Sequence, residues 1–74
     1  MVVSQMQKGQ KAVVKKLHAS SELKRRLNSF GVIKGATLTF LAAAPKKSTV
    51  EIEVSKMKLA LRKEEADTIE VELC

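Results

Sequence analysis

The chain of 74 residues has no tryptophan and no tyrosine, and Phe30 and Phe40 are its only aromatic residues. Hydrophobic residues still make up 45% of the sequence, so the core must be built mainly from aliphatic side chains. The longest uninterrupted apolar stretch, residues 40–44, is far below the roughly 18 residues that a membrane span requires. We therefore expect one small domain, residues 1–74, that meets a membrane only through a partner.

Metal-ligating residues are equally scarce. His18 and Cys74 are the only soft ligands, and no Cys-x-x-Cys or His-x-x-x-His spacing occurs. Four glutamates of the C-terminal third alternate with apolar residues, which predicts the solvated faces of two strands; they are Glu51, Glu53, Glu70 and Glu72. We expect no high-affinity metal site and no bound cofactor.

Catalytic constellations are also lacking. The chain has one histidine and one aspartate, Asp67, and no grouping of nucleophile, base and orienting acid. It has no phosphate-binding Gly-x-x-x-x-Gly-Lys loop. We therefore expect a protein that is not an enzyme. The single cysteine and the start "MVVSQMQKG", which has no basic leader or apolar signal segment, favour a cytosolic location.

What the chain does have is a polarised charge. Residues 1–48 carry ten lysines and arginines against one acidic residue, Glu22, whereas residues 49–74 carry four basic and seven acidic residues. The first part is therefore +9 and the second −3, which sum to the net charge of +6. This asymmetry favours an acidic partner or weak self-association.

The sequence predicts one helix near the start, over residues 22–29. Leu23, Leu27 and Phe30 recur at helical spacing, a serine at position 20 or 21 can cap the start, and Gly31 is suited to the end. Before this helix, "KAVVKKL" predicts a strand with Val13 and Leu17 on one face and Val14 opposite, and residues 1–8 read as a polar lead-in.

After Gly31 the apolar period changes to two, which predicts four more strands. "TVEIEV" is the cleanest, and "RKEEAD" predicts about one helical turn before the last strand. Five short alternating strands bury their apolar faces best by curling, so we predict a mainly β fold: a small SH3-like barrel of about five strands with a helix inserted after the first. Met57 and Leu73 are also expected to point inward. The predicted core is Leu23, Leu27, Phe30, Leu38, Phe40, Val50, Ile52, Val54, Leu59, Leu61, Ile69 and Val71.

Two segments carry a family resemblance. "ELKRRLNSFGVIKGATLTFLAAAP" resembles the part of the FeoA family in which a basic, leucine-containing helix ends at a glycine and a second glycine opens the next strand. "VEIEVSKMKLALRKEEADTIEVE" resembles the remainder. Lys34 stands where the family usually has proline, and "KKS" follows Ala-Pro where many members have Gly-Asp. The resemblance spans about residues 5 to 73.

The resemblance implies an SH3-like barrel, also seen at the C-terminus of diphtheria-toxin-repressor-type iron regulators, and a cytosolic accessory or regulatory protein of ferrous iron uptake. The implied partner is the cytosolic domain of the transporter FeoB. The family's transition-metal label implies no coordination site here, because the ligand clusters are missing.

The candidate partner-binding residues are Lys24, Arg25, Lys34, Gly31 and Gly35. Most charge runs on a short helix are simply its solvated face, and this remains one interpretation of Lys24 and its basic neighbours. The other competing hypothesis is a small basic barrel that binds RNA or the ribosome, as the opening "KGQKAVV" allows. The lack of aromatic stacking residues makes nucleic acid the less favoured partner.

Overall fold

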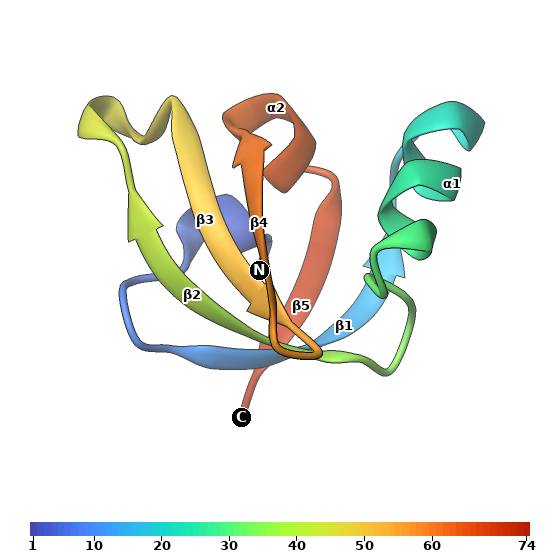
Figure 1. The fold of residues 1–74 in the computed structure, drawn as a ribbon, viewed down its shortest axis with the longest axis horizontal. Coiled ribbons are helices and arrows are strands. Elements are labelled where there is room, and N and C mark those ends of the chain that lie inside the picture. The colour runs from blue at the N-terminus through green and yellow to red at the C-terminus, as the bar shows by residue number, and fades with distance from the viewer.

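Five antiparallel strands form one curved sheet in a computed structural model that describes residues 1–74 (Figure 1). The strands are β1 (Lys11–Leu17), β2 (Thr37–Ala43), β3 (Thr49–Val54), β4 (Met57–Arg62) and β5 (Ile69–Leu73), in the order β4-β3-β2-β1-β5. Helix α1 (Ser21–Ser29) follows β1, and the single turn α2 (Lys63–Ala66) precedes β5. Two short 3-10 turns, η1 (Val3–Gln5) and η2 (Pro45–Lys47), complete the chain. The predicted mainly β fold, with one inserted helix and one late helical turn, is confirmed.

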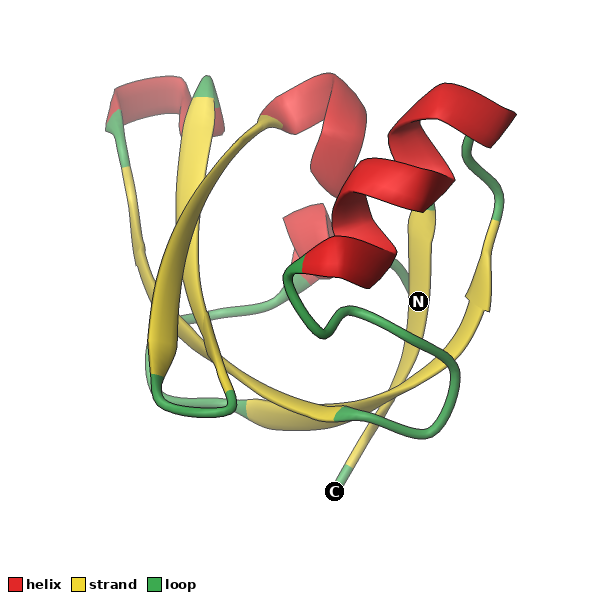
Figure 2. Cartoon of the chain, turned by 45° about the vertical axis from the view of Figure 1, so that its right-hand side comes forward, coloured by secondary structure: helices red, strands yellow, loops and turns green.

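Two bulges bend the sheet. The register shifts between Val14 and Lys16 where β1 pairs with β5, and between Phe40 and Ala42 where β2 pairs with β3. An extra residue in one strand bends it and increases its twist, so the sheet curls around its own apolar face. The outermost strands, β4 and β5, do not pair with each other, and α2 connects them. Figure 2 shows α1 lying across the concave side of the curved sheet.

The core is a single cluster of 16 buried hydrophobic residues. Ten of the twelve predicted core residues belong to it, and Leu23 packs against it half-buried. The buried residues that the pattern did not predict are Val3, Met6, Ala12, Val14, Val32 and Ala66. No helix of the chain has both the length and the apolar character needed to cross a membrane.

Phe30 was wrongly predicted to be buried. It is the C-cap of α1 and is 37% exposed, because the chain leaves the helix there and turns at Gly31, where φ is +93°. Val32 is buried in its place. Its N–H donates to the Leu27 carbonyl at 3.0 Å, and the Gly31 N–H donates to that of Asn28 at 3.0 Å. This pair of bonds is a Schellman motif, in which the second residue past the helix packs back on its last turn.

The buried face of β1 also differs from the prediction. Ala12 and Val14 are buried, whereas Val13 is half-buried. Lys15 is the extra residue of the bulge, so Leu17 returns to the inner side opposite Ile69 despite its odd spacing from Val14. Strict alternation fails at this point because the bulge shifts the pleat by one residue.

Met57 and Leu73 were likewise expected to point inward and are 49% and 40% exposed. Met57 opens the edge strand β4 immediately after a two-residue turn in which Ser55 and Lys56 both have positive φ. Leu73 is the last residue of β5. Both positions lie at strand ends, where the curved sheet no longer has a facing layer to cover them.

Residues 1–8 are part of the fold rather than a polar lead-in. Val3 and Met6 are fully buried, and Val2 forms an isolated bridge with Glu70 of β5. The Lys47 ammonium donates to the main-chain carbonyls of Ser4 at 3.1 Å and Met6 at 3.2 Å. The Ser4 hydroxyl donates to the Asp67 carboxylate beyond α2. The segment is therefore held by side chains from η2 and from the end of α2.

Candidate partner-binding surface

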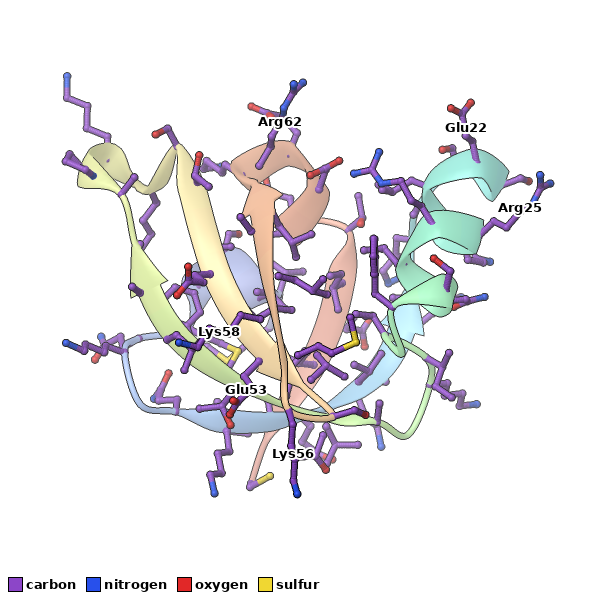
Figure 3. All side chains as sticks on the ribbon, viewed as in Figure 1. Glu22, Arg25, Glu53, Lys56, Lys58 and Arg62 are labelled. Carbon is purple, nitrogen blue, oxygen red and sulfur yellow. The ribbon has the colours of Figure 1, made fainter.

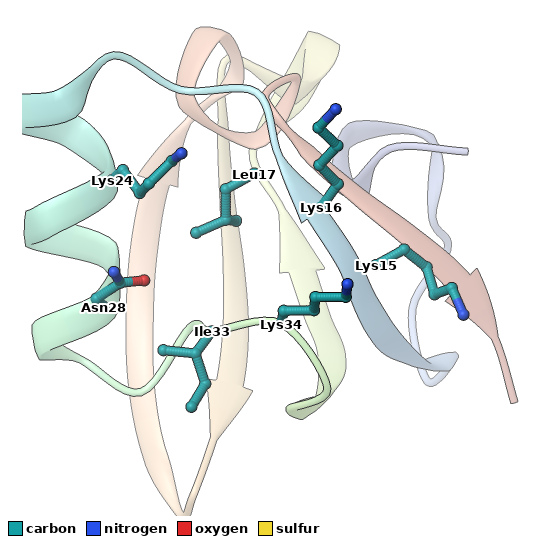
Figure 4. Close-up of a pocket in the computed structure, with 7 residues that line it drawn as sticks. All are labelled: Lys15, Lys16, Leu17, Lys24, Asn28, Ile33 and Lys34. Atoms are coloured by element: carbon teal, nitrogen blue, oxygen red, sulfur yellow. The ribbon is translucent and has the colours of Figure 1, made fainter.

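A groove with a volume of about 490 Å³ lies between α1, the bulged end of β1 and the loop from α1 to β2 (Figure 4). We call it the lysine groove, because four of its seven lining residues are lysines: Lys15, Lys16, Leu17, Lys24, Asn28, Ile33 and Lys34. Figure 4 shows Leu17 and Ile33 between Lys24 and Asn28 on one side and Lys16 and Lys34 on the other. An apolar centre with cations on both sides is suited to an anionic ligand that also has an apolar part.

The walls of the groove are fixed by main-chain hydrogen bonds. The Schellman motif joins the loop to α1. At the other side, the Gly35 N–H donates to the Val14 carbonyl at 2.8 Å, and the Val14 N–H donates to the Ala36 carbonyl at 2.8 Å. Gly35 has φ of +91°, a conformation that other residues adopt only with strain. These bonds position Ile33 and Lys34 before any ligand arrives, which lowers the entropic cost of binding.

The three consecutive basic residues of α1 do not all face the same surroundings. Lys24 lines the lysine groove. Arg25 extends from the outer side of α1 (Figure 3), where it lines a separate hollow of about 360 Å³ with Glu22, Arg26 and Ser29. Arg26 forms an ion pair with Glu65 of α2 at 2.5 Å. Because successive residues of a helix are about 100° apart, a run of three cannot share one face.

The structure therefore brings together only part of the predicted site. Lys24 and Lys34 line the same groove, and Gly31 and Gly35 begin and end the loop that carries Lys34. Arg25 does not line this groove and instead borders the second hollow. The pattern did not single out Lys15, Lys16, Leu17 and Ile33, which complete the groove. The doublet Lys15-Lys16 inside a strand was the available signal, since alternation leaves no reason for two adjacent exposed cations there.

The charges of the groove are almost unneutralised. No acidic residue lines it, and its only ion pair is a 3.5 Å contact between the Lys15 ammonium and Glu72. Elsewhere, several acidic side chains are engaged in ion pairs. The Arg62 N–H at 2.9 Å, followed by the Arg26 guanidinium, holds the pKa of Glu65 below its ordinary value. His18, at 2.6 Å, lowers the pKa of Glu70. The groove thus presents a local excess of positive charge.

Metal-binding side chains do not converge anywhere on the molecule. No group of three or more histidine, cysteine, aspartate or glutamate side chains is placed to hold an ion. His18 and Cys74, the two soft ligands, are both exposed, and His18 is engaged with Glu70. The groove lysines are protonated donors and do not supply metal ligands.

Comparison with known proteins identifies the family. The model of the FeoA domain matches residues 1–73. A Campylobacter jejuni protein that carries the provisional name Fe(2+) transport protein A is 41% identical over 73 residues, which cover 99% of each chain. The chain is also 30% identical over 73 residues to a Porphyromonas gingivalis fusion of Fe(2+) transport protein A with the Fe(2+) transporter FeoB, covering 99% of this chain and 9% of the fusion.

Solved structures agree with this assignment. The FeoA protein of Chlorobium tepidum superposes with a TM-score of 0.92 at 33% identity, covering 99% of this chain and 70% of that one. The zinc complex of FeoA from Stenotrophomonas maltophilia, described as a prokaryotic SH3 domain protein, has a TM-score of 0.80 at 30% identity, covering 97% of this chain and 89% of that one. The fold is therefore of the SH3-like class. The chain belongs to the FeoA family, whose named relatives here are Fe(2+) transport proteins, and the resemblance inferred from the sequence is confirmed.

Proposed function

We propose that this protein is a cytosolic accessory protein of ferrous iron uptake that binds the cytosolic part of a FeoB-type transporter and regulates it without catalysing a reaction. The observation that carries the proposal is the Porphyromonas gingivalis fusion, in which a segment similar to this whole chain is joined to FeoB. Covalent linkage keeps two domains at a high effective concentration. A separate chain must supply that proximity through a binding surface of its own.

The docking face in this proposal consists of α1 and the loop from Gly31 to Gly35. It is the most cationic concave surface of the chain, and Lys24 and Lys34 lie on it. Electrostatic attraction to an acidic partner would chiefly accelerate and orient the encounter. Apolar side chains on the same face, such as Ile33, which is 48% exposed, would supply affinity.

The test is binding of the purified full chain to the isolated cytosolic domain of FeoB by biolayer interferometry, with and without guanine nucleotide and Fe(II). We expect saturable binding whose association rate falls with added salt. Ferrous iron uptake by cells that have FeoB but lack their own FeoA provides the functional readout, and this chain should increase it. No binding under any of these conditions, together with unchanged uptake, would refute the proposal.

Charge reversal of Lys24 and Arg25 together should leave folding nearly intact, because exposed charges contribute little to stability. It should slow association with the transporter domain, and separate reversal shows which side of α1 is responsible. A double variant that folds, binds and supports uptake like the unmodified chain would mean that the basic run is only a solvated helix face.

A further inference from the structure

The lysine groove has the features of a selective site and not only of a charged patch. Its lysines come from three successive segments that the fold brings together: β1, α1 and the loop before β2. Its centre is aliphatic, with Leu17 half-buried and Ile33 48% exposed. Asn28 adds an amide that can both donate and accept a hydrogen bond at the rim.

Resting on the function proposed above, we propose that the lysine groove binds an acidic segment of the partner protein in which one aliphatic side chain is flanked by carboxylates. The aliphatic side chain contacts Leu17 and Ile33, and the carboxylates meet Lys24 on one side and Lys16 and Lys34 on the other. Charge complementarity selects this occupant, because no acid of the chain itself lines the groove.

The shape and chemistry of the groove favour a peptide over other anionic partners. A single-stranded nucleic acid requires stacking surfaces, and neither of the two phenylalanines lines the groove. A membrane surface is met by a flat or convex basic patch, whereas these lysines surround a hollow of about 490 Å³. A simple inorganic anion would make no use of Leu17 and Ile33.

The neighbouring residues Lys24 and Arg25 give a matched pair of variants. Lys24→Glu removes a cation from the groove, and Arg25→Glu makes the same charge change on the same helix but outside the groove. Both side chains are exposed, and neither forms an ion pair across 4.0 Å or less, so their effects on folding should be equally small. Lys34→Glu adds a second position in the groove, on a different element.

The binding probe is a synthetic peptide, Gly-Glu-Asp-Leu-Asp-Glu-Gly, with two control peptides: one with serine for leucine, and one with glutamine and asparagine for the acids. Amide chemical shifts of the isotope-labelled full chain report the site at low salt. We expect the acidic leucine peptide to perturb residues 15–17, 24, 28, 33 and 34. The double variant Lys24→Glu with Lys34→Glu should bind the acidic leucine peptide about tenfold or more weakly, which corresponds to about 1.4 kcal/mol. The affinity of the Arg25→Glu variant for the same peptide should stay within about twofold of that of the unmodified chain, because Arg25 does not line the groove.

Several results would overturn this inference. Shifts confined to other surfaces would place the site elsewhere. Equal affinity for the serine peptide, or equally tight binding of inorganic tripolyphosphate, would reduce the groove to a generic anion site. Tighter binding of a ten-nucleotide uridine RNA at the same lysines would assign it to nucleic acid. The leucine peptide should bind about fivefold or more tightly than the serine peptide, because partial burial of the leucine side chain already contributes this much.

A competition experiment between the leucine peptide and the transporter domain tests the groove assignment and the proposed function separately. If the transporter domain binds but the leucine peptide does not compete and the groove variants have no effect, the partner uses another surface and only the groove assignment fails. If the peptide binds in the groove but no transporter domain binds, the proposed partner fails while the peptide specificity stands. If both hold, Lys24→Glu with Lys34→Glu should weaken both interactions in parallel.

Discussion

Replacing Met6 by alanine would test whether the first eight residues are part of the folded domain. Met6 has no exposed surface, and its carbonyl accepts from the Lys47 ammonium at 3.2 Å. Truncating a buried methionine costs about 2–5 kcal/mol, because the contacts are lost and a cavity remains. A domain of 74 residues is stable by roughly 4–11 kcal/mol in total. A loss of about 3 kcal/mol would therefore lower Tm by roughly 12–24 °C.

The measurement is urea unfolding followed by far-UV circular dichroism, since the chain has no tryptophan or tyrosine for fluorescence. The adjacent variant Gln7→Ala is the matched control, because Gln7 is exposed and should change the free energy of unfolding by no more than about 0.5 kcal/mol. The denaturant slope should stay the same in both variants if each still unfolds in one transition. A Met6→Ala chain as stable as the Gln7→Ala chain would refute the assignment of this segment to the core.

Three further expectations concern the contacts around α1 and α2. A double-mutant cycle on Arg26 and Glu65 should give a coupling of about 0.2–1 kcal/mol, because the pair is partly exposed and screened by water; zero coupling would mean that the ion pair does not hold α1 to α2. Gly31→Ala should destabilise the chain by about 1–2 kcal/mol through backbone strain alone, because an added Cβ would lie 3.6 Å from Val54, in ordinary contact; an unchanged urea midpoint would contradict it. The pKa values of Glu65 and Asp67 lie below their ordinary values of 4.5 and 3.8, and for Asp67 the main cause is the hydrogen bond from Ser4. In acid the unfolded state therefore binds more protons than the folded state. The free energy of unfolding should be constant above about pH 5 and fall as the pH drops through the lowered pKa values, and urea midpoints that stay flat down to pH 3 would contradict this.

The strands after Gly31 could be predicted because their alternation is regular. Val50, Ile52 and Val54 are all buried, as their spacing of two requires. The prediction of buried positions failed where a bulge or a helix-ending motif interrupts the regular spacing of apolar residues. The bulge at Lys15 moves Leu17 to the inner side, and the Schellman motif exchanges Phe30 for Val32.

The buried start of the chain illustrates another limit. Val3 and Met6 lie in and next to a 3-10 turn of three residues, η1. A segment this short contains too few positions to establish a period, so polar neighbours outweigh its two apolar residues in any pattern. Its burial depends on Lys47 and Asp67, which are distant in sequence and meet it only once the sheet has curled. Contacts of this kind are set by tertiary structure.

The basic run at residues 24–26 shows that the candidate site, too, depends on tertiary structure more than on sequence adjacency. The three residues are adjacent in sequence, but the helix places Lys24 in the lysine groove, whereas Arg25 and Arg26 line a separate hollow and Arg26 is also paired with Glu65. The cations that do share a surface with Lys24 come from β1 and from the loop before β2, and the bulge places two of them there. The surface that can recognise a partner is therefore the set of lysines that the fold brings together in the groove. Lys24 belongs to that set, whereas Arg26 has a structural partner in Glu65, and this is why single reversals along the run should have unequal effects on binding.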